Sequence, residues 1–223
     1  MALSSKLFAM NNIWFFLIPV GISWFLLSNS GGAAEVQNVD RTGSPLGVGS
    51  CGSCHSGGNY SPVISIEVLD NNSVINKYSP GKSYQVRVSI AAGNNPRGYG
   101  FQLVSLSGNN NVQGGVFGNA PAGFNKISLD NRVYVEQSST RTSGTFVIPW
   151  TAPAVGTGSV RFYGAGVAVN GNGGSGGDAH VQAALPLTIS EDLATLSVSS
   201  STISFPASGG SQPIDITSNT NWT

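Results

Sequence analysis

The sequence predicts an all-β protein built as an antiparallel sandwich, and three observations support this fold class. Charged residues make up only 9% of the chain, well below the roughly 25% that is typical of soluble domains. β-branched residues dominate the apolar set, and no segment shows helical periodicity. Short alternating runs are separated by turn sequences such as SPGK, GNNPRG and NAPAG.

Two runs show the alternation of period two that marks strands with one solvated face. They are PVISIEVLD and SYQVRVSIA, in which the residues expected to face the core are Ile64, Ile66 and Val68, followed by Tyr84, Val86, Val88 and Ile90. Six further strands are expected at 99–106, 112–117, 132–137, 144–151, 159–169 and 179–189. About eight short strands without a helix are typical of an antiparallel sandwich.

The first residues have the pattern of an export signal. Lys6 precedes the apolar run at 13–27, and the small residues SNSGGAA follow it, as in secretory signal peptides. We interpret residues 1–34 as a signal peptide that is cleaved after Ala34. The apolar run is shorter than the roughly 20 residues that a membrane span needs, so no span is expected after cleavage. A secreted or cell-surface protein is therefore expected.

The rest of the chain divides into three parts. Residues 35–62 lack apolar periodicity and are interpreted as a loop segment, and residues 63–190 as the sandwich. Residues 195–223 restart the strand pattern but contain only two or three strands, too few to bury a core. We interpret them as a truncated second β-sandwich module. The ten acidic and ten basic residues balance, which argues against nucleic acid as a partner.

Both cysteines of the chain lie in one short motif together with a histidine. Cys51, Cys54 and His55 form the sequence C-x-x-C-H, the attachment signal of a c-type haem. In such a site the thiols form thioethers with the porphyrin vinyl groups, and the imidazole is the proximal iron ligand. We therefore expect one covalent haem c at these three residues.

Three other interpretations of the motif remain open at this point. A disulfide between Cys51 and Cys54 is compatible with an exported protein. A thioredoxin-like redox pair would need a βαβ context that the sequence lacks. Zinc would need four ligands, which the two cysteines together with His55 and His180 could supply.

The sixth iron ligand is narrowed by elimination, because Met1 and Met10 both lie in the signal segment. His180, the other histidine, opens a predicted strand after a glycine-rich loop and is the candidate distal ligand. Otherwise His180 is an exposed strand residue, and the iron is five-coordinate or binds water or a lysine. The lysines considered are Lys77, Lys82 and Lys126. Asp178 and Glu136 are interpreted as scattered, solvated carboxylates.

The sequence from GSPLGVGSCGSCHSGG to NGNGGSGGD, about residues 42–190, resembles the choice-of-anchor V, Reeler-like domain of bacterial surface proteins. The landmarks are GFQL, WTAP and NGNG followed by GD. The resemblance implies an immunoglobulin-like, Reeler-type sandwich that carries a haem-attachment motif. Relatives often have a histidine in the stretch matching YVEQSST, where this chain has Gln137. The final LSVSSSTISFPASGGSQPIDITSNTNWT resembles the opening of a BACON domain of surface and carbohydrate-active proteins.

These features favour an exported cytochrome-like protein for electron transfer at the cell surface, and not an enzyme. Ligation by two histidines leaves no open iron position, whereas an open position would suit peroxidase-like chemistry. The sequence does not identify the redox partner, and self-association would be one way to bring haems of neighbouring subunits together. The alternative is a haem-free adhesion or carbohydrate-binding module in which Cys51 and Cys54 form a disulfide.

Overall fold

The computed structural model describes residues 31–219, and these are organised almost entirely as strands. In this part of the chain the larger sheet has nine strands, six of them in the order β1-β13-β12-β6-β10-β9. Their bounds are β1 Ser56–Gly57, β13 Gly176–Gln182, β12 Val160–Val169, β6 Gly98–Ser107, β10 Arg132–Gln137 and β9 Phe124–Leu129. The other three are β14 Leu187–Glu191, which pairs with β12, β4 Lys77–Tyr78, which pairs with β14, and β7 Val112–Gln113, which pairs with β6.

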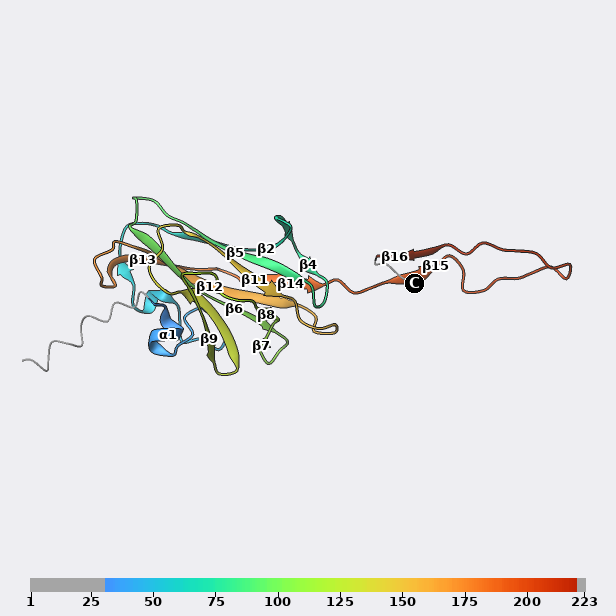
Figure 1. Cartoon of the computed structure of the whole chain (residues 1–223), viewed down its shortest axis with the longest axis horizontal. Helices are drawn as coiled ribbons and strands as arrows, with labels where there is room; N and C mark the ends of the chain where they lie inside the picture. Colours follow the sequence, from blue (N-terminus) through green and yellow to red (C-terminus); the bar gives the residue numbers. More distant parts are fainter. Residues whose placement is uncertain (1–30, 220–223) are drawn as a thin grey trace, which may run out of the picture.

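The second sheet of residues 31–219 has five strands in the order β3-β2-β5-β11-β8. Their bounds are β3 Ser73–Ile75, β2 Val63–Asp70, β5 Ser83–Ala91, β11 Thr145–Thr151 and β8 Val116–Phe117. The two sheets form the sandwich seen in Figure 1. The predicted all-β class is therefore confirmed.

The core lies between the inner faces of the two sheets and is rich in aromatic rings. Every inward position expected in β5 is buried there, and Trp150 of β11 lies at the centre of an aromatic cluster. The Trp150 ring meets Phe162 and Tyr78 edge to face, at centroid distances of 5.1 and 6.0 Å, an arrangement that adds to the energy of apolar burial. Its Nε1 donates a hydrogen bond to the carbonyl oxygen of Gly114, at 2.9 Å.

A second, smaller cluster lies on the outer face of the larger sheet. It consists of Ala34, Val104, Leu106 and Tyr134, all fully buried. Ala34 belongs to the short helix α1 (Ala33–Gln37), which lies against β9 and β10 (Figure 1). The segment around α1 therefore covers one side of the sheet, and β6 is buried on both faces. This cover also forms one wall of the candidate site.

The strand pattern differs from the expectation in several places. Residues 35–62 contain the end of α1, the 3-10 helix η1 (Cys51–Ser53) and the short strand β1, where only a loop was expected. Strands β3, β4 and β9 were also not expected, and the strands expected at 112–117 and 179–189 are each divided in two. The second break contains Pro186, which has no N–H to donate to a ladder.

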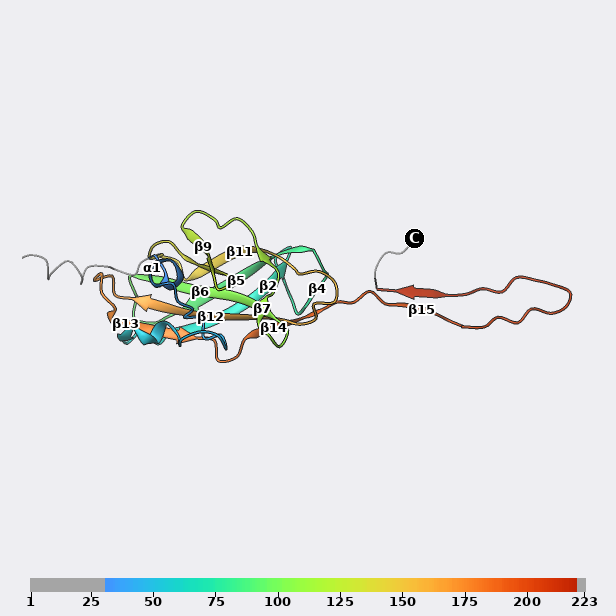
Figure 2. The same ribbon diagram turned by 90° about the horizontal axis from the view of Figure 1, so that it is seen from below.

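Beyond the sandwich, β15 (Leu196–Val198) and β16 (Ile216–Ser218) form an antiparallel pair. Figure 2 shows this hairpin extending away from the two sheets, as it also does in Figure 1. Most of the expected signal peptide, residues 1–30, lies outside the described residues, as do residues 220–223. Cleavage after Ala34 would also remove the start of α1, so the burial of Ala34 and the hydrogen bond from its N–H to Glu136 belong to the uncleaved chain.

Candidate functional site

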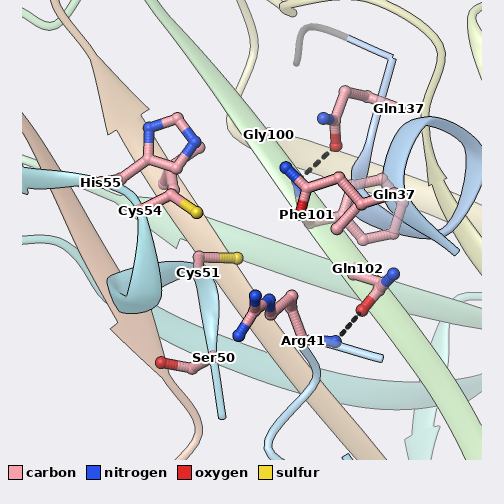
Figure 3. A pocket seen from close by; sticks show the side chains of 12 residues that line it. Gln37, Arg41, Ser50, Cys51, Cys54, His55, Gly100, Phe101, Gln102 and Gln137 are labelled. Carbon is pink, nitrogen blue, oxygen red and sulfur yellow. Dashed lines mark hydrogen bonds between the residues drawn. The ribbon is translucent and has the colours of Figure 1, made fainter. Parts of the chain in front are cut away.

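A short turn places the two thiols and the imidazole on the same side of a loop. The hydroxyl oxygen of Ser50 accepts a hydrogen bond from the N–H of Gly52, at 3.3 Å, and begins η1. The N–H groups of Cys54 and His55 both donate to the carbonyl oxygen of Cys51, at 3.2 and 3.0 Å. In Figure 3 both sulfur atoms and the imidazole are directed toward the same pocket.

The larger sheet holds this loop because β1, which follows it directly, runs parallel to β13. The N–H of Gly58 donates to the carbonyl oxygen of Asp178, at 2.8 Å. A Cβ atom on Gly58 would lie 2.5 Å from the oxygen of Gly177, and one on Gly52 would lie 2.5 Å from Nε2 of His180. Such separations are too short for real Cβ atoms, so glycine at both positions permits the close approach.

The imidazole of His55 is paired with a buried carboxylate. Nδ1 of His55 lies 2.8 Å from Oδ2 of Asp178, which is a buried residue. The other oxygen, Oδ1, accepts the main-chain N–H of Asn170, at 2.9 Å. Nε2 of His55 has no hydrogen-bond partner among residues 31–219. The ring is therefore fixed through Nδ1, while Nε2 is available to a ligand.

The two cysteines are free thiols in different surroundings. Cys54 is exposed, whereas burial raises the pKa of the Cys51 thiol to about 12. Redox-active cysteine pairs of the thioredoxin type have a lowered thiol pKa, whereas the pKa of Cys51 is raised, so this environment does not favour such a pair. Residues 31–219 contain no group of three or more histidine, cysteine or acidic residues that could hold a metal ion. The four-ligand zinc site considered above is therefore not formed.

The pocket lies outside the sandwich core, between the loop, the segment around α1 and the larger sheet, and its volume is about 50 Å³. Its lining residues are Ala33, Gln37, Arg41, Ser50, Cys51, Cys54, His55, Gly100, Phe101, Gln102, Gln137 and Val167. Gln137 is thus a wall residue. Its side-chain oxygen accepts the N–H of Phe101, at 2.7 Å.

Arg41 brings a positive charge to this pocket. Its main-chain N–H donates to the side-chain oxygen of Gln102, and its Nη1 donates to the carbonyl oxygen of Val48. Nε of Arg41 is buried and has no partner among residues 31–219. Because an unpaired buried donor is costly, this atom favours a ligand that brings an acceptor such as a carboxylate.

His180 does not line the pocket. Its ring lies over Gly52, and its Nδ1 donates to the carbonyl oxygen of His55, at 2.9 Å. The three lysines considered as ligands also have other partners: Asp192 for Lys77, Asp70 for Lys82 and the main chain of Phe117 for Lys126. The structure thus brings Cys51, Cys54 and His55 together at the pocket. His180 contacts the main chain of their loop and does not line the pocket.

Two carboxylates that were expected to be solvated are fully buried. Asp178 contacts His55, as described, and Glu136 accepts the N–H groups of Ala34 and Glu35, at 3.0 and 2.8 Å. Desolvation by burial is the main cause of the raised pKa of Glu136. Sequence reasoning also missed Arg41. No local pattern marks any of the three, because strand pairing and contacts between distant segments determine their burial.

No protein-family model matches the chain, and a search of curated proteins finds no match. Among solved structures it is similar to the reeler domain of human F-spondin, at a TM-score of 0.43 and 23% identity. That alignment covers 58% of this chain and 92% of the reeler domain. It is also similar to AggA, the major subunit of aggregative adherence fimbriae type I from Escherichia coli. There the TM-score is 0.38 and the identity 11%, with 61% of this chain and 97% of that one covered.

Reeler domains are therefore among the structural neighbours of this chain. The attachment of haem at Cys51, Cys54 and His55 stays a prediction. So do the resemblances to the choice-of-anchor V and BACON domains. In residues 31–219 no helix is both long and apolar enough to cross a membrane.

Proposed function

We propose that this protein is an exported carrier of one covalent haem c that transfers electrons outside the cytoplasm. One observation supports this most strongly. The sulfur atoms of Cys51 and Cys54 lie on the same side of the loop as the imidazole of His55, whose Nε2 is free to bind iron. A motif that occurred by chance would have no reason to orient all three groups into one pocket.

The residues around the pocket fit such a group. Each thiol would add across one vinyl double bond, sulfur bonding to one carbon and hydrogen to the other, so that no oxidant or reductant is consumed. Nε2 of His55 would bind the iron, and the buried Nε of Arg41 would meet a propionate carboxylate. Because a pocket of about 50 Å³ is far smaller than a porphyrin, these residues would hold a porphyrin at the pocket mouth and not enclose it.

A bound haem would supply one-electron chemistry. The chain contributes the covalent attachment, the orientation of His55 and a positive charge close to the group. Electron transfer to or from a redox partner is the role that we propose for this site.

The direct test is the visible absorption spectrum of the full chain, produced in an exporting host that matures c-type cytochromes. We expect a haem spectrum that remains with the polypeptide after denaturation. The double variant Cys51→Ala/Cys54→Ala should lose it, and the matched control Ser53→Ala, in the same turn, should keep it. A colourless wild-type protein would contradict the proposal. A disulfide between Cys51 and Cys54 in that protein would support the haem-free surface module.

A further inference from the structure

The His55 ring contacts the buried carboxylate of Asp178. Asp178 is 0% exposed, and no lysine or arginine forms an ion pair with it among residues 31–219. Its two oxygens are taken by Nδ1 of His55 and the N–H of Asn170. A buried carboxylate needs hydrogen-bond donors to offset its lost hydration. The His55 ring supplies one of the two hydrogen bonds that the Asp178 carboxylate accepts.

This requirement determines which ring nitrogen carries the proton. With hydrogen on Nδ1, His55 donates to Asp178 at 2.8 Å, and the lone pair of Nε2 is directed away from the carboxylate. With hydrogen on Nε2, the lone pair of Nδ1 would face a carboxylate oxygen at the same distance. That second arrangement is repulsive and leaves a buried charge without a donor. The protonated Nδ1 form is therefore favoured, and it is the form that binds a metal through Nε2.

The main chain holds Asp178 in place beneath His55. β1 begins directly after His55 and pairs in parallel with β13, which carries Asp178. The N–H of Gly58 donates to the carbonyl oxygen of Asp178, and Asn170 holds the carboxylate from the other side. Both partners are therefore fixed by the sheet, and the contact does not depend on the rotamer of an exposed side chain.

We infer that Asp178 is a positioning residue for His55, which fixes its tautomer, directs Nε2 into the pocket and increases the electron donation of the imidazole to iron. This inference rests on the proposed function for its redox consequence. A more electron-donating ligand favours the oxidised iron, as hydrogen bonds to metal-ligating histidines generally do. Asp178 thus lowers the reduction potential of the bound group.

The first experiment needs no haem. Nitrogen NMR of the Cys51→Ala/Cys54→Ala chain, with the imidazole neutral, reports the His55 tautomer. We expect hydrogen on Nδ1 when Asp178 is present, and a loss of this preference in the Asp178→Asn background. Hydrogen on Nε2 with Asp178 in place would overturn the inference. This measurement can be made on the double variant alone, so it remains decisive if Asp178→Asn does not fold.

The second experiment is potentiometric titration of the haem-loaded chain. At a fixed potential, Asp178→Asn should raise the ratio of reduced to oxidised haem about tenfold, which is about 59 mV for one electron. Glu136→Gln is the matched control, since it neutralises another buried carboxylate that makes no hydrogen bond to His55. An unchanged ratio in Asp178→Asn, or an equal change in the control, would overturn the inference while the proposed function stands. A wild-type chain without haem would contradict the proposed function. In that case the NMR measurement of the His55 tautomer would still test whether Asp178 positions the ring.

Discussion

Nδ1 of His180 lies 2.9 Å from the carbonyl oxygen of His55 and donates a hydrogen bond to it. His180 therefore stabilises the loop that carries Cys51, Cys54 and His55. His180→Ala should therefore leave the haem spectrum unchanged and lower the free energy of unfolding by about 1 kcal/mol, the usual value of one hydrogen bond. Absorption and urea unfolding measure the two effects. His180→Asn is the control, since its amide can donate in the place of Nδ1. A changed spin state in His180→Ala would instead support the distal role that the sequence suggests.

Gly58 lies against the main chain of β13, whereas Gly52 lies against a side chain of β13. Substitution by alanine should therefore lower the free energy of unfolding for a different reason at each position. An added Cβ at Gly58 meets the main chain of Gly177, which cannot move aside without displacing β13. We expect Gly58→Ala to lower the free energy of unfolding by about 1–3 kcal/mol, as overpacking usually does. Urea unfolding measures the cost, and an unchanged midpoint would contradict the close approach of β1 to β13.

Gly52 faces the ring of His180 and not a main-chain atom, so its cost should depend on that side chain. Gly52→Ala should destabilise the wild type but cost much less in the His180→Ala background. A double-mutant cycle by urea unfolding measures this coupling. Equal costs in the two backgrounds would show that the His180 ring does not lie over Gly52.

The buried carboxylate of Glu136 predicts a specific pH dependence. Its pKa is raised above the ordinary value of 4.5, mainly by desolvation, so folding favours the protonated form. Its contribution to stability is full below the unfolded pKa and is lost as the pH rises through the folded pKa. The free energy of unfolding of the wild type, relative to Glu136→Gln, should therefore fall as the pH rises above about 4.5.

Urea unfolding at several pH values measures this difference for Glu136. The control is Glu67→Gln, in the opposite sheet, where the carboxylate pairs with Arg87 and is partly exposed. The burial of Glu136 would be contradicted if the free energy of unfolding of the wild type, relative to Glu136→Gln, rose with pH. It would also be contradicted if the same difference measured against Glu67→Gln had the same slope.

Trp150 tests the core between the two sheets. The ring is fully buried, and its Nε1 donates to the oxygen of Gly114. Trp150→Phe removes this bond and leaves a small cavity, so we expect a loss of about 2–3 kcal/mol of unfolding free energy. Val116→Ala, at an exposed position in the neighbouring β8, should stay within about 0.5 kcal/mol. Similar urea midpoints for the two variants would be incompatible with this core.

The sequence predicted those strands best in which polar and apolar residues alternate. In β5, Val86 and Val88 face the core as expected, because alternation reflects a sheet with one solvated face. The run FNKISL of β9 mixes Lys126 with half-buried residues at a sheet edge, and this strand was missed. The helix α1 has only five residues, too few to show a helical period.

The candidate site was predictable only in part, and for a related reason. Cys51, Cys54 and His55 are adjacent in sequence, so their spacing alone indicates the chemistry. Asp178 lies 123 residues from His55 and meets it through the pairing of β1 with β13, which no local pattern encodes. Arg41 enters the pocket through the segment around α1, whose packing was likewise not visible in the sequence.

The mass of the denatured full chain, purified from an exporting host that matures c-type cytochromes, tests the central claim most directly. The account predicts a gain of one haem, located by peptide mapping on the peptide that contains both Cys51 and Cys54. Unmodified thiols, or a disulfide between these two residues, in that preparation would contradict it.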